Sequence, residues 1–120
     1  MKFPKMNPKI KKMWVKALRS GEYGQGQKRL LTIEKSGEHS FCCLGVLCDL
    51  HSRETGEKWN IRNDLFDGKV GAYEDYETMP GEGVDSWAGL DTEAQDILAS
   101  MNDDRRLSFK QIANWIQNNL

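Results

Sequence analysis

The sequence predicts one α+β domain over residues 1–120, with about four helices packed around a small antiparallel sheet. Apolar residues recur at helical spacing in three segments, each of which follows a capping residue. A fourth segment, 43–54, is so broadly apolar that it predicts a helix buried at the centre of the fold. Short runs of strand-forming residues between turn signals supply the sheet. A chain of this length buries enough surface for a single core.

The first helix is predicted to begin at Asn7-Pro8, because asparagine caps helix N-termini and proline suits the first helical position. Ser20-Gly21 ends it. The lysines at positions 9, 12 and 16 fall on the side opposite the apolar face. That face contains the residues at i, i+3, i+4, i+7 and i+8, which are Ile10, Met13, Trp14, Ala17 and Leu18.

The segment 28–35 (KRLLTIEK) is rich in strand formers, and Ser36-Gly37 predicts a tight turn into a hairpin that reaches Phe41. The central helix follows from Cys43 and ends before Gly56. Its apolar residues cover much of the helix circumference, which is typical of a helix surrounded by other elements.

Residues 57–86 form a variable, acidic excursion from this pattern. Two short strands are predicted over 58–62 and 68–76, separated by Asn63-Asp64 and Asp67-Gly68 turns. Residues 78–87 are predicted to be a loop. Between 67 and 85 there are six acidic residues and one lysine, so we expect this segment to be solvated, mobile or facing a cation.

The last third of the chain contains two helices separated by the turn NDDRR (102–106). Thr92 with Gln95 fits a capping box at the start of the first helix, and Ser108 with Gln111 fits one at the start of the second. The apolar residues after each box recur at helical spacing, so both segments are predicted to pack against the core.

The net charge of −1 hides a strong asymmetry along the chain. Residues 1–35 carry ten Lys or Arg against two Glu, whereas residues 36–104 carry four against sixteen Asp or Glu. This distribution has two interpretations: a basic arm that binds an anionic partner, or halves that neutralise each other within the fold or between subunits of a homo-oligomer.

The sequence predicts a cytoplasmic protein that does not associate with membranes. It has no secretory signal at the N-terminus and no apolar run approaching the roughly 20 residues that cross a bilayer. The three cysteines are an odd number, which favours free thiols in a reducing compartment.

The stretch SFCCLGVLCDLH (40–51) holds all three cysteines and is a candidate reactive site. The spacing lacks a C-x-x-C pair and disfavours zinc or redox chemistry, so no metal and no cofactor are predicted. Cys42 is the one candidate nucleophile, because it would lie at a helix N-terminus and His39 would be its base. The alternative is that the thiols are small buried hydrophobic groups. The side chains in and beside this stretch that could ligate zinc are His39, Cys42, Cys43, Cys48 and His51.

The loop GEYGQGQ (21–27) and its flanks form the predicted binding site. Its glycines allow a ligand to approach the backbone, the basic side chains suit an anion, and the tyrosine and glutamines offer stacking and hydrogen bonds. The alternative is a flexible helix-to-strand connection. The predicted ligand-binding residues are Arg19, Tyr23, Gln25, Gln27, Lys28 and Arg29.

Four segments resemble a group of small proteins encoded by bacteriophages and prophages. These are WVKALRSGEYGQGQKRL (14–30), FCCLGVLCDL (41–50), WAGL (87–90) and LASMNDDRRLSFKQIANWI (98–116). The shared pattern is W-x-x-A-L-R-S-G-x-Y-x-Q-G, then C-C-L-G-V-L-C, then N-D…F-x-x-I-A, and it leaves out residues 51–86. Gly24 departs from the group, in which that position is often basic.

The resemblance implies a phage accessory protein that works in the cytosol of a bacterial host. We expect a non-enzymatic binding protein that acts on a host protein or on a small, anionic, nucleotide-like ligand, and by analogy with viral strategy it would counter a host defence. The first alternative is a small enzyme that uses Cys42 or an acidic pocket from residues 64–85. The second is a nucleic-acid-binding protein that uses the basic N-terminal region.

Overall fold

The computed structural model describes residues 3–64 and 68–120, and it contains five helices and a four-stranded sheet in these ranges. The elements in chain order are α1 (Pro8–Arg19), β1 (Leu31–Ile33), β2 (His39–Phe41), α2 (Cys43–Thr55), β3 (Asn60–Asn63), β4 (Lys69–Ala72), α3 (Glu82–Ala88), α4 (Thr92–Asp103) and α5 (Phe109–Asn119). The predicted α+β class is confirmed.

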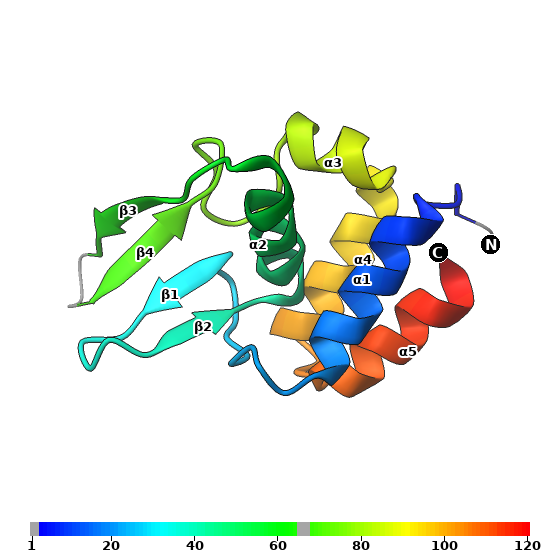
Figure 1. Ribbon diagram of the computed structural model, residues 1–120. Coiled ribbons are helices and arrows are strands. Elements are labelled where there is room, and N and C mark those ends of the chain that lie inside the picture. The colour runs from blue at the N-terminus through cyan, green and yellow to red at the C-terminus, as the bar shows by residue number, and fades with distance from the viewer. Residues whose placement is uncertain (1–2, 65–67) are drawn as a thin grey trace.

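The sheet has the order β2-β1-β4-β3, and all three pairs are antiparallel. The hairpin predicted to reach Phe41 is present, because Leu31 pairs with Phe41 across β1 and β2. Figure 1 shows the sheet at one end of the molecule and the helices α1, α4 and α5 at the other, with α2 between them. In this arrangement β4, from the acidic excursion, is an interior strand of the sheet.

The predicted central helix is confirmed as α2, in which Cys43 to Cys48 and His51 are buried. It contacts α1, α3, α4 and β2, which explains why apolar residues surround most of its circumference. Gly45 allows this packing, because a Cβ atom there would lie 1.8 Å from the backbone oxygen of Leu30. Any larger residue would therefore push α2 away from Leu30, the residue just before β1.

Helix α1 begins as predicted, since the Asn7 Oδ1 atom accepts hydrogen bonds from the backbone N–H groups of Lys9 and Ile10. Its apolar side packs against α2 and α5. Trp14 is fully buried on that side, and its indole Nε1–H donates to the Cys43 backbone oxygen at 3.0 Å. This hydrogen bond ties the first helix to the start of the central one.

The number of helices was underestimated, because residues 78–87 were predicted to be a loop and instead contain α3. The helix ends at Gly89, which adopts a left-handed conformation with φ of 65°. Val84 and Ala88 are fully buried, and α3 packs on α2. Burial of these two side chains stabilises a segment whose proline and glycines are typical of a loop.

The capping-box prediction was right for α5 and wrong for α4. Ser108 and Gln111 make both reciprocal bonds, at 3.2 and 2.9 Å. The N-cap of α4 is Asp91, one residue before Thr92, and Gln95 is buried. Helix α4 also continues to Asp103, so the turn predicted to begin at residue 102 begins two residues later. The predicted Asp67-Gly68 turn lies outside the described residues.

Candidate functional site

The predicted loop site is built into the scaffold through Gln25. Its side-chain Nε2 donates to the Asn102 Oδ1 atom at 3.0 Å and to the Leu107 backbone oxygen at 2.8 Å. Its Oε1 accepts from the backbone N–H of Phe109 at 3.2 Å. These bonds fix the loop to the corner between α4 and α5, where the first turn of α5 has unsatisfied backbone donors.

Asn102, which the sequence prediction placed in a turn, is fully buried and links three of the four resembling segments. Its Oδ1 accepts from Gln25 and from the Cys43 backbone N–H, the latter at 3.2 Å. Its Nδ2 donates to the Gly26 backbone oxygen at 2.8 Å and to Asp103 Oδ1 at 2.9 Å. The Q-G, C-C and N-D parts of the shared pattern therefore meet at one side chain, which sequence-based reasoning missed.

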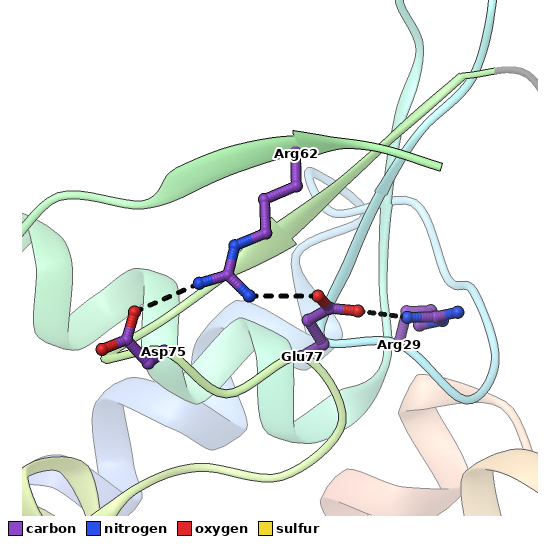
Figure 2. Close-up of polar contacts among 4 residues, drawn as sticks. All are labelled: Arg29, Arg62, Asp75 and Glu77. Carbon is purple, nitrogen blue, oxygen red and sulfur yellow. Dashed lines mark hydrogen bonds and ion pairs between the residues drawn. The ribbon is translucent and has the colours of Figure 1, made fainter. Parts of the chain in front are cut away.

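Arg29 is held by an ion-pair chain that joins the loop to the sheet (Figure 2). Its guanidinium pairs with Glu77, whose other carboxylate oxygen accepts from Arg62 at 3.2 Å. Arg62 also pairs with Asp75 at 3.1 Å. Two arginines and two carboxylates balance in charge, so this chain presents no surplus positive charge to an anion.

The other predicted ligand-binding residues contact different elements. The Tyr23 hydroxyl donates to Asp49 at 2.6 Å, and burial, reinforced by this carboxylate, raises the pKa of Tyr23. The Lys28 backbone N–H donates to Asp103 at 2.8 Å. The backbone oxygen of Gln27 accepts from the Arg29 N–H at 2.9 Å. The six residues thus do not face one common space, and their polar groups mainly hold the loop in place.

Arg19 differs from the rest because it lines a groove between α1 and α5, two helices that lie side by side (Figure 1). Two adjoining cavities of about 580 and 660 Å³ share the residues Pro8, Lys11 and Gln117. We call this surface the basic groove. Its basic residues are Lys5, Lys11, Lys12, Lys16 and Arg19.

The basic groove has an unbalanced charge. Within the described residues, none of its lysines forms an ion pair, and no aspartate or glutamate side chain lines either cavity. Arg19 donates to the neutral Asn114 side chain on α5 at 2.8 Å. The fold of the single chain therefore leaves the basic face of α1 unneutralised, and neutralisation between subunits stays an alternative to an anionic partner.

Cys42, the candidate nucleophile, is the N-cap of α2, and its sulfur accepts from the Gly45 backbone N–H at 3.4 Å. It is 4% exposed, and burial raises the pKa of its thiol to about 11. The N-terminus of α2 lowers the thiol pKa, but this effect does not offset the rise caused by burial. Burial thus favours the protonated thiol at neutral pH, which disfavours Cys42 as a nucleophile. The base proposed for it, His39, is exposed on β2.

The remaining thiols and carboxylates do not form a metal centre. Cys43 and Cys48 are buried, and all three cysteines are free. In the described part of the chain, no group of three or more His, Cys, Asp or Glu side chains is arranged to hold a metal ion. In the same residues no helix is long and apolar enough to cross a membrane.

The acidic excursion contributes a buried polar cluster beside α3. The Glu74 Oε1, Asp85 Oδ1 and Gln95 Nε2 atoms are buried without a hydrogen-bond partner in the described residues. Burial raises the pKa of Asp85, the Gln95 amide opposes the shift, and the Glu74 carboxylate adds to it. Gln95 is buried on α4 beside this cluster, and the N-cap of α4 is Asp91.

Fold and site together define a small α+β domain with buried thiols, an internal polar network and one unneutralised basic face. The chain belongs to a family described as a domain of unknown function, DUF8296, whose model matches residues 6–120. No curated protein and no solved structure matched the chain significantly.

Proposed function

We propose that this is a non-enzymatic binding protein whose basic groove takes an anionic partner. The observation that carries the proposal is the unpaired charge of α1, which persists in a chain with 18 acidic residues. Like charges held on one face repel one another and destabilise the folded state. A bound anion offsets that repulsion, and the groove places four basic side chains around a single cavity.

The resemblance to phage-encoded proteins supports a setting in the cytosol of a bacterial host. There the partner would be a host protein or a small, anionic, nucleotide-like ligand, and its capture would counter a host defence. Burial of the Cys42 thiol supports binding over covalent catalysis. Arg19 contributes to the proposed site, whereas Gln25 and the Lys28 backbone support the groove indirectly by bonding to the α4–α5 corner.

Tripolyphosphate is the probe that tests the proposal, with amide NMR shifts as the measurement. We expect saturable shifts in α1 and in the α5 residues 114–118. Neutralising two groove lysines, Lys12→Gln with Lys16→Gln, is expected to weaken binding at least about tenfold, which corresponds to 1.4 kcal/mol. The matched control is Lys58→Gln with Lys69→Gln, two exposed lysines outside the groove, and it should bind normally.

Unchanged spectra, or equal weakening by both double variants, would contradict the proposal. Sedimentation at several protein concentrations adds a second measurement. Self-association that Lys12→Gln with Lys16→Gln abolishes would identify the anionic partner as the acidic surface of a second copy, and the protein as a homo-oligomer.

A further inference from the structure

We infer that the anionic partner of the basic groove is the sugar–phosphate backbone of a duplex nucleic acid, bound without reading its sequence. This inference rests on the anion-binding role proposed for the groove, and it puts a duplex in place of the host protein or nucleotide-like ligand named there. The competing partners are a mononucleotide and an acidic protein. Three features of the groove separate these possibilities: its length, the chemistry of its lining and the position of the acidic residues.

The length of the groove favours a run of backbone phosphates over a single phosphate group. Lys11 and Arg19 lie eight residues apart on α1, which is about 12 Å at 1.5 Å per residue. One strand of a duplex advances about 3.4 Å per phosphate along the axis. The helix therefore extends past three to four successive phosphates, about as many as the basic side chains it contributes.

The cavity over Lys12 and Lys16 has a lining that suits phosphates better than bases or an apolar protein anchor, whereas the adjoining cavity also contains Phe3 and Met6. In the cavity over Lys12 and Lys16, the described residues provide no aromatic ring to stack a base and only Pro8 and Val15 as apolar contacts. Protein-binding surfaces concentrate their binding energy in buried aromatic and arginine side chains. Lysines flanked by amides are instead typical of contacts to phosphate oxygens, and α5 contributes Gln117 to the groove.

The acidic side chains lie on other elements, so they orient a polyanion instead of blocking it. Helices α1 and α5 contain no Asp or Glu, whereas α3 and α4 together contain five. A duplex is therefore attracted to the α1–α5 face and repelled from the α3–α4 side. Such a distribution permits phosphate binding even though the net charge of the chain is −1.

Fluorescence anisotropy with a labelled 20-base-pair DNA duplex tests the inference across a salt series. Four phosphate contacts predict that log K falls with log salt at a slope of about −3.6, or about 150-fold weaker binding between 50 and 200 mM salt. Two duplexes of unrelated sequence should bind equally. Lys12→Gln with Lys16→Gln should lower the slope by about 1.8 and the affinity about 60-fold at 0.1 M salt. Lys58→Gln with Lys69→Gln should match the wild type.

Several outcomes overturn the inference. Undetectable duplex binding at 50 mM salt, a slope near zero, or a slope that Lys12→Gln with Lys16→Gln leaves unchanged would each do so. Polyglutamate that binds as tightly as the duplex would assign the groove to an acidic protein. If tripolyphosphate still binds in the groove when DNA does not, this inference fails and the proposed function stands. If neither binds, both fail.

Discussion

Replacing Asn102 by alanine removes four hydrogen bonds from the buried network that Asn102 forms with Gln25 and nearby backbone groups. The four partners that lose a bond to Asn102 are not equally affected. Gln25 Nε2 keeps the Leu107 oxygen as an acceptor, and Asp103 Oδ1 keeps the Lys28 N–H as a donor. The Cys43 N–H and the Gly26 carbonyl lose the side-chain partner that Asn102 gives each of them. The cost therefore comes mainly from these two backbone groups.

A buried polar group left without a partner costs about 1 to 3 kcal/mol, so Asn102→Ala is expected to lower the free energy of unfolding by about 2 to 6 kcal/mol. For a chain of 120 residues, the entropy of unfolding is about 250 cal/mol/K. The expected loss in Tm is therefore about 8 to 24 °C. Asn118→Ala, on the exposed side of α5, should change the free energy by less than about 0.5 kcal/mol.

Urea unfolding followed by tryptophan fluorescence measures both variants. A double-mutant cycle with Gln25→Ala tests whether the two side chains act together, and we expect a coupling of about 0.5 to 3 kcal/mol. The reasoning is refuted if Asn102→Ala unfolds at the same urea concentration as Asn118→Ala, or if the effects of Asn102→Ala and Gln25→Ala simply add.

Three further predictions concern the core and the acidic cluster. The three buried thiols should react with iodoacetamide only after denaturation, and one thiol that reacts quickly in the folded protein would restore the enzyme alternative. Gly45→Ala should destabilise the fold by about 3 kcal/mol or more, because its Cβ would meet the Leu30 backbone oxygen, and a variant with the wild-type Tm would refute this. Because the pKa of Asp85 is raised in the folded state, its ionisation costs stability as pH rises above the ordinary carboxyl range. Asp85→Asn should thus unfold at higher urea than wild type at pH 7, and the difference should shrink toward pH 3; the opposite trend would refute the assignment.

Elements with local signals could be predicted from the sequence. The Asn7 and Ser108 caps bond to backbone groups within three residues, so their effect does not depend on the rest of the fold. Helix α3 could not be predicted in the same way. Its cap forms no side-chain hydrogen bond, and burial of Val84 and Ala88, in a helix that packs on α2, stabilises it. Thr92 was mistaken for a cap because Asp91, the residue before it, is equally suited to that position.

The candidate site could be predicted only in part, because residue type does not identify a partner. The loop composition predicted that its glutamine and arginine side chains bind a ligand. Tertiary structure decides that Gln25 binds the α4–α5 corner and that Arg29 binds Glu77. Asn102 carried one weak signal, an amide directly after the apolar pattern of its helix. The lysines of α1 were visible, but only the structure shows that no carboxylate approaches them in the described residues.

The polar network around Gln25 and Asn102 and the basic groove use largely different residues, so substitutions can change one without changing the other. The network needs the Gln25 and Asn102 side chains in one geometry, because each makes at least three hydrogen bonds within the fold. The groove needs only positive charge on the solvent side of α1, where glutamine substitutions break no internal contact. Stability and anion affinity should thus respond to separate sets of substitutions. Arg19 differs from the groove lysines because it both lines the groove and bonds to the Asn114 side chain on α5.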